Sequence, residues 1–274
     1  MPETSVVFES GGRRLVGLLQ TPFEGAVRER WLFAYPLFEE RKSSQRVLVT
    51  MGRALAASGR AVLLFDYRGC GDSEGDFEAY SLPHWQADLR TAGDWLAARF
   101  PHARSGILGL RLGATLVWRE AARPEKPFDR VVLWSPVVNG QAYLVAELRR
   151  KVMKEMLTFG AGQSRRDDLV RKLQAGESVD FDGYAISSSL FRDLAEWDIT
   201  PPFPSVPPEG AIIGLTPQAR PDPALLRWAE AWKQAKGRCT LQFVAEPPFW
   251  SLIGLVPCTE LIRTTRFWIT GETG

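Results

Sequence analysis

The sequence predicts an α/β fold in which helices flank a mostly parallel central sheet and a small helical cap interrupts the core. Two observations support this prediction. Short β-rich runs alternate with segments of helical periodicity, and the alternation stops between residues 139 and 205 before it resumes. With 274 residues, the chain is long enough for one large core that carries such an insertion.

Strands and helices are expected in alternation along both parts of the core. Short β-rich runs predict strands at residues 14–20, 31–35, 61–66, 106–110, 131–134, 211–215 and 240–245. Apolar residues at helical spacing predict helices at residues 46–57, 85–96, 114–122, 143–157, 223–236 and 259–269. Because helices connect most successive strands, the sheet should be mostly parallel.

The predicted insertion differs from the core in composition. It begins with a long basic helix, continues through a break at Gly160, Ala161 and Gly162, and contains further helical segments to about Glu196. A connector with five prolines follows at residues 201–208, where fixed φ angles and missing N–H groups exclude regular structure. We therefore predict an α/β core from residues 1–138 and 206–274, and a helical cap with its connector from residues 139–205.

Composition and charge argue against several classes of function. The 34 basic and 32 acidic residues are spread along the chain and leave a net charge of +2, which disfavours nucleic-acid binding. Cys70, Cys239 and Cys258 lack the spacing of a zinc site or a disulfide framework, and we expect neither a metal nor a cofactor. The chain has no run of 18 apolar residues and no signal-like start, which predicts a cytoplasmic protein without a transmembrane segment.

Two motifs lie at the ends of predicted strands. Residues 66–73 read Asp-Tyr-Arg-Gly-Cys-Gly-Asp-Ser, and residues 109–113 read Gly-Leu-Arg-Leu-Gly. The first is similar to the D-x-R-G-x-G-x-S loop of the α/β-hydrolase superfamily. The second resembles the G-x-S-x-G elbow of that superfamily, whose small residues permit a sharp turn from strand to helix. The resemblance implies an α/β-hydrolase fold in which Arg111 stands at the position of the nucleophilic serine.

A closer resemblance covers most of the chain. Besides the two motifs, it rests on Pro36 with Glu39, Glu40 and Arg46, on residues 85–89 (Trp-Gln-Ala-Asp-Leu), on residues 136–138 (Pro-Val-Val), and on residues 248–250 (Pro-Phe-Trp). In these segments the chain resembles the exosortase A system-associated hydrolase type 2 group. The resemblance implies a role in bacterial exopolysaccharide production, exosortase-dependent protein sorting or another biosynthetic gene cluster.

The catalytic residues of a serine hydrolase are incomplete in this sequence. Arg111 stays protonated at physiological pH and has no lone pair for attack on a carbonyl. The catalytic histidine should follow the last strand, where residues 246–250 read Glu-Pro-Pro-Phe-Trp. His102 precedes the elbow strand and should lie about 15 to 20 Å from Arg111. Asp222 falls where a triad acid would come, but without a histidine to orient we expect a solvated residue before a helix.

Three other residues are weak candidates for chemistry. Cys70 lies in the first motif, where Arg68 or Arg111 would have to lower the pKa of its thiol. Ser135 ends a predicted strand, and His84 lies at the same edge of the sheet as the elbow. Structural roles are the favoured interpretation for all three, with His84 in the first turn or capping region of a helix.

Arg111 is suited to binding rather than to attack. With the backbone N–H of Leu112 at the start of a helix, its guanidinium offers a place for a carboxylate or phosphate. The alternative is an ion pair with a nearby glutamate, and Glu40 is the favoured partner. Both interpretations stay open. The expected ligand-binding residues are Arg111, Leu112, Tyr35, Glu39, Glu40, Glu246 and Trp250, with Phe249 and Trp250 either lining the pocket or packing beneath the cap.

Three functions are consistent with these residues. The favoured hypothesis is a noncatalytic or repurposed hydrolase-fold protein, a pseudoenzyme that binds an anionic or acyl-bearing metabolite or a partner biosynthetic enzyme. The second is a hydrolase or acyl transferase acting on esters or thioesters, which uses Arg111 to stabilise developing negative charge. The third is a scaffold subunit whose pocket is closed by an arginine–glutamate pair.

Overall fold

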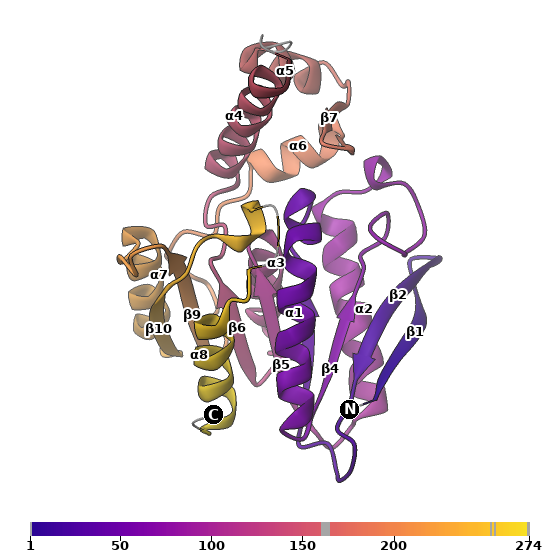
Figure 1. Cartoon of the computed structure of the whole chain (residues 1–274), viewed down its shortest axis with the longest axis vertical. Helices are drawn as coiled ribbons and strands as arrows, with labels where there is room; N and C mark the ends of the chain where they lie inside the picture. Colours follow the sequence, from indigo (N-terminus) through magenta and orange to yellow (C-terminus); the bar gives the residue numbers. More distant parts are fainter. Residues whose placement is uncertain (1, 160–164, 253, 255, 273–274) are drawn as a thin grey trace.

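A central sheet with helices on both faces forms the body of the protein, as described by a computed structural model for residues 2–159, 165–252, 254 and 256–272 (Figure 1). The sheet has eight strands in the order β1-β2-β4-β3-β5-β6-β9-β10. Their bounds are β1 (Glu3–Ser10), β2 (Arg13–Gln20), β3 (Glu29–Ala34), β4 (Arg60–Phe65), β5 (Arg104–Leu110), β6 (Arg130–Trp134), β9 (Glu209–Thr216) and β10 (Arg238–Ala245). β2 pairs antiparallel with both β1 and β4, and all the other pairs are parallel. The predicted α/β class with a mostly parallel sheet is confirmed.

Helices cover both faces of the sheet. On one face lie α1 (Glu39–Ala57) and α8 (Thr259–Thr270), and on the other lie α2 (Leu82–Arg99), α3 (Leu112–Ala121) and α7 (Pro223–Gln234) (Figure 1). Successive strand residues point to opposite faces, so Trp31 and Phe33 of β3 pack beneath α1, whereas Leu32 and Ala34 pack toward α2. Because both faces are buried, the central strands read as continuous apolar runs.

An insertion between β6 and β9 lies at the carboxyl edge of the parallel strands (Figure 1). It contains α4 (Gly140–Phe159), α5 (Arg166–Gln174), β7 (Val179–Phe181), β8 (Tyr184–Ile186) and α6 (Ser188–Ala195). The expected break at residues 160–162 lies outside the described residues. The further helical segments expected up to about Glu196 are α5 and α6, and between them β7 and β8 form an antiparallel hairpin that the sequence did not predict. Asp182 and Gly183, both with positive φ, make its tight turn.

Two elements of the core differ from the prediction. β1 was not predicted, because this edge strand is mostly exposed and lacks the apolar alternation of a half-buried strand. Helix α1 begins at Glu39, whereas the sequence predicted a start at residue 46. The first two turns were missed because they are too polar to show helical periodicity. Two glutamates in the first turn of α1 suit the positive end of the helix dipole. The other predicted core elements agree with the structure to within three residues at each end.

The loop after β4 is held in place by a buried ion pair. Asp88 of α2 is fully buried, and its carboxylate accepts hydrogen bonds from Nε of Arg68 at 2.8 Å and from the backbone N–H of Arg68 at 2.9 Å. The indole N–H of Trp85 donates to the carbonyl of Arg68 at 3.0 Å. Both motif segments 66–73 and 85–89 therefore serve to fix this loop against α2.

No helix among the described residues combines the length and apolar character that would be needed to cross a membrane.

Removing the charge of Asp88 should destabilise the fold strongly. Asp88→Asn leaves the guanidinium of Arg68 buried without its carboxylate partner, which should lower the free energy of unfolding by about 3 kcal/mol. Urea denaturation measures this change. The matched control is Glu260→Gln, which removes a carboxylate from a solvent-exposed pair with Arg263 and should leave the denaturation midpoint unchanged. Equal midpoints for the two variants would contradict the structural role of the Arg68–Asp88 pair.

Candidate functional site

Arg111 occupies the sharp turn between β5 and α3. Its backbone has φ 55° and ψ −122°, a conformation that L-residues rarely adopt. Two glycines make room for the turn: a Cβ on Gly113 would lie 2.3 Å from the carbonyl oxygen of Tyr35, and one on Gly109 would lie 2.6 Å from the backbone of Ala114. The Gly-x-Arg-x-Gly motif thus forms an elbow, and its central residue projects from the carboxyl edge of the sheet.

The side chain of Arg111 is held by polar contacts on two sides. Its Nε donates to Oε1 of Glu40 at 3.2 Å, and its Nη1 donates to the carbonyl of Ser135 at 3.2 Å. The guanidinium carbon lies 4.9 Å from the ring centre of Trp250 and 5.7 Å from that of Tyr143, both within the range of cation–π interactions. The side chain of Arg111 is 22% exposed, so the ion pair lies at the edge of the interior.

Glu40 links this arrangement to the insertion. It lies in the first turn of α1, its side chain is 6% exposed, and its Oε2 accepts a hydrogen bond from the hydroxyl of Tyr143 at 3.3 Å. Tyr143 belongs to α4, so α1, the elbow and the insertion meet at one carboxylate. Glu39 turns away from Arg111 and contacts Lys154 of α4, with 3.5 Å between Oε2 and Nζ.

Burial shifts the pKa values of Glu40 and Arg111. It raises the pKa of Glu40 above its usual value, with the nearby Glu147 carboxylate acting in the same direction and Arg111 opposing the rise. Burial also acts to lower the pKa of Arg111, but the Glu40 carboxylate outweighs this effect and the pKa is raised. The guanidinium therefore stays charged, and it has no lone pair to act as a nucleophile or a base.

A small cavity of about 120 Å³ adjoins Arg111, Ser135 and Trp250, and Asp222 also lines it. Asp222 caps α7, with Oδ1 accepting the N–H of Ala224 at 2.8 Å, and it is exposed. The hydroxyl oxygen of Ser135 accepts the N–H of Leu215 at 3.0 Å. Both side chains therefore have structural partners.

Three other predicted site residues make no recognised contact with the guanidinium of Arg111 among the described residues. Tyr35 is buried on the α1 face with the guanidinium of Arg41 over its ring at 5.2 Å. Glu246 caps α8, where its carboxylate accepts the N–H groups of Glu260 and Leu261. Leu112 follows the elbow as the first residue of α3, so its N–H has no acceptor one turn back within that helix.

The weak catalytic candidates also have structural roles. Cys70 is buried, and burial raises the pKa of its thiol, so it is protonated and unreactive. His84 lies in the first turn of α2, where its Nδ1 accepts the N–H of Ser81 at 3.2 Å. His102 is exposed and lies two residues before β5, at the opposite end of that strand from the elbow. These two are the chain's only histidines, so no histidine lies beside Arg111.

The structure thus brings together Arg111, Glu40 and Trp250 from the predicted set, and it adds Tyr143. Trp250 lies in the segment after β10, where a triad histidine was expected, and its ring faces the guanidinium instead. Tyr143 could not be placed from the sequence, because its contact with Glu40 depends on how the insertion docks. It is the first aromatic residue of the predicted basic helix, and nothing in the periodicity distinguishes it from a core position.

Comparison with known proteins shows the family to which the chain belongs. Residues 41–182, more than half of the chain, match the family described as "Serine aminopeptidase, S33". The chain belongs to this α/β-hydrolase family. No curated protein sequence matches the chain.

Solved structures share the α/β-hydrolase fold of the chain over nearly its whole length. Est1E from Butyrivibrio proteoclasticus, with ferulic acid bound, has a TM-score of 0.70 and 16% identity over 97% of this chain and 98% of that one. An esterase from Pyrococcus furiosus has a TM-score of 0.65 and 16% identity over 100% and 92%. A serine hydrolase without a lid from Xanthomonas campestris has a TM-score of 0.56 and 18% identity over 91% and 88%. At such identities the likeness shows the fold alone.

The raised pKa of Glu40 gives the stability of this α/β hydrolase a pH dependence of definite sign. The folded protein keeps the proton on Glu40 after the unfolded chain has lost it, at a pKa of about 4.3. The contribution of Glu40 to stability is therefore full below that unfolded pKa and is lost as pH rises through the raised folded pKa. The free energy of unfolding of the native protein minus that of Glu40→Gln should decrease as pH rises above about 4.

Urea denaturation of both proteins at a series of pH values measures this difference. A difference that grows with pH would contradict the prediction, because it would mean that Arg111 holds the carboxylate ionised more strongly than burial disfavours it. Glu39→Gln, at the neighbouring but more exposed position, is the matched control.

Proposed function

We propose that this chain is a noncatalytic member of its family, a pseudoenzyme whose elbow residue is a structural cation. The observation that supports this is the set of contacts of Arg111, which is bonded to Glu40 and Ser135 and flanked by Trp250 and Tyr143. The position that must carry a nucleophile in a serine hydrolase is thus occupied by a side chain that cannot attack a carbonyl and is already engaged.

The contacts of the described residues also leave the site without a general base and without an alternative nucleophile. A general base must lie within hydrogen-bond reach of the nucleophile, and the segment after β10 offers an indole ring there. Cys70 is a buried thiol with a raised pKa, and the hydroxyl of Ser135 is bonded to the backbone of β9. None of the candidate groups in the described chain is therefore both activated and open to a substrate.

We further propose that the protein acts by binding, as an accessory protein in bacterial exopolysaccharide, exosortase or related biosynthesis. This context follows from the resemblance of the elbow and the flanking segments to the exosortase A system-associated group. The partner class is a biosynthetic enzyme or a metabolite of such a system, and the proposed location is the cytoplasm. Residues 139–205 would form a cap on a core made of residues 1–138 and 206–274.

The purified protein should not hydrolyse simple esters or thioesters above the buffer rate, and a fluorophosphonate probe, which reacts with activated serines, should not label it. p-Nitrophenyl acetate and an acyl thioester are suitable substrates, with an active serine esterase as the positive control. Arg111→Ser should also remain inactive, because it restores a hydroxyl without a base. Turnover that is present in the native protein and disappears in Arg111→Ala would overturn the proposal.

Binding of a small anion beside Arg111 is a second candidate function. It is favoured by the cavity of about 120 Å³ next to a guanidinium that uses two of its five N–H groups in hydrogen bonds with the described residues. A carboxylate or phosphate there would form charge-assisted bonds with the remaining donors. Glu40 weakens this candidate, because it already neutralises the guanidinium.

Thermal denaturation with and without acetate or phosphate tests the second candidate. Binding should raise the midpoint of the native protein in proportion to the logarithm of the anion concentration and leave that of Arg111→Met unchanged. Equal shifts in both proteins would show a general salt effect and remove this candidate.

A further inference from the structure

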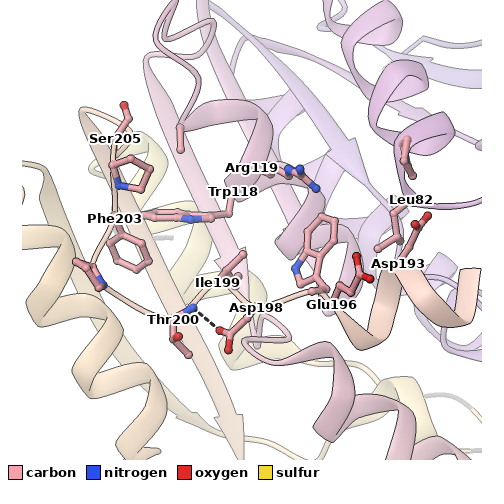
Figure 2. Close-up of a pocket in the computed structure, with 15 residues that line it drawn as sticks. Leu82, Trp118, Arg119, Asp193, Glu196, Asp198, Ile199, Thr200, Phe203 and Ser205 are labelled. Atoms are coloured by element: carbon pink, nitrogen blue, oxygen red, sulfur yellow. Dashed lines mark hydrogen bonds between the residues drawn. The ribbon is translucent and has the colours of Figure 1, made fainter.

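A second and larger cavity lies away from the elbow, between α2, α3, the end of α6 and the proline-rich connector (Figure 2). Its volume is about 570 Å³, and it shares no lining residue with the cavity beside Arg111. Small-molecule sites typically have volumes of about 300 to 1,000 Å³. Binding in this cavity is independent of whether the elbow is catalytic.

Aromatic rings form the apolar part of the wall. Trp118 of α3 and Phe203 of the connector meet edge to face, with 4.9 Å between their ring centres (Figure 2). The ring of Trp118 also packs edge to face against Trp228 and Trp232 of α7, with 4.9 Å and 4.7 Å between the ring centres. The buried ring of Trp118 is therefore held rigidly, and together with the half-buried ring of Phe203 it forms the apolar part of the cavity wall.

Two buried polar atoms at this cavity have no partner within the part of the chain that the structure describes. Trp197, which is 6% exposed and lines the cavity, has an indole N–H without an acceptor. Asp193, also in the lining, has an Oδ2 without a donor. Buried polar groups in folded proteins are nearly always hydrogen-bonded, and an unmade bond is costly. Each of the two atoms has less than 1 Å² of exposed surface, so a ligand that supplies one acceptor and one donor would satisfy both atoms once neighbouring side chains shift.

The charge of the lining is unbalanced. Asp193, Glu196 and Asp198 contribute three carboxylates against the single guanidinium of Arg119, which leaves a formal charge of −2. Asp198 is engaged by the N–H of Thr200 and by Asn139. Asp193 and Glu196 have no ion-pair partner among the described residues, and Figure 2 shows their carboxylates together at the end of the cavity away from Trp118 and Phe203.

We propose that this cavity binds an organic cation that has an aliphatic stem and a carbonyl oxygen, as in a lysine side chain with its backbone. The ammonium group would lie at Asp193 and Glu196, and the stem would pack on the rings of Trp118 and Phe203. The carbonyl oxygen would accept the N–H of Trp197. The two polar parts of such a ligand meet atoms, Asp193 Oδ2 and the indole N–H of Trp197, that have no partner among the described residues.

Isothermal titration calorimetry on the full chain tests this proposal with three probes. Nα-acetyl-lysine amide carries all three features, Nα-acetylnorleucine amide lacks the ammonium group, and cadaverine lacks the carbonyl oxygen. Nα-acetyl-lysine amide should bind at millimolar concentration, and the norleucine compound should bind at least about tenfold more weakly, because it lacks the charge-assisted bond. Free lysine distinguishes the source: tighter binding than the capped form indicates a free amino acid, and weaker binding indicates a peptide side chain.

Variants connect binding to the named residues. Asp193→Asn should weaken binding of Nα-acetyl-lysine amide by about tenfold, and Trp197→Phe should weaken it while leaving cadaverine unaffected. Glu196→Gln, at an exposed position, gives the same direction of change if Asp193→Asn fails to fold. Glu177→Gln removes an exposed charge of the same insertion outside the cavity and should change nothing. Equal binding of the lysine and norleucine compounds, or binding unchanged by both Asp193→Asn and Glu196→Gln, would overturn the proposal.

Discussion

The ion pair between Arg111 and Glu40 is the interaction on which the carboxyl edge of this molecule depends. It joins the elbow to the first turn of α1, and through the hydroxyl of Tyr143 it reaches the insertion. Buried ion pairs stabilise proteins weakly, because desolvation offsets most of the attraction, but one partner without the other is strongly unfavourable. The pair therefore determines how the elbow, α1 and the insertion are positioned, and it contributes little to the net stability. The raised pKa of Glu40 reflects the same desolvation.

The fold could be predicted because its determinants are local. Apolar runs of strand length and helical spacing recur in alternation, and the parallel sheet follows from that order. The elements that the sequence did not reveal lack these signals. β1 is an exposed edge strand, the start of α1 is polar, and the hairpin of β7 and β8 depends on a two-residue turn between strands of three residues each. Such short strands are shorter than the windows in which periodicity can be recognised.

The candidate site was only partly predictable, because its members come from segments distant in sequence. The glycines of the motif identified Arg111 as the elbow residue, since small residues are needed at both sides of the turn. Glu39 and Glu40 lie on a helix that turns them about 100° apart, so that Glu40 contacts Arg111 and Glu39 contacts Lys154. Tyr35 follows β3 and Glu246 follows β10, and the side chains of both have partners other than Arg111. Long-range docking decides all of these contacts.

Helix α3 lies between the two cavities, and because it is held rigidly in the core, a change at one cavity is not transmitted through it to the other. Arg111 precedes it, whereas Trp118 lies about two turns further on, roughly 10 Å along the axis. Every residue of α3 except Arg119 is buried, so the helix cannot shift without disturbing the core on both sides. A ligand in the larger cavity would therefore leave the elbow in place. Its contacts with α6 and the connector would instead bias how the insertion sits on the core, since those segments form the other wall of the cavity.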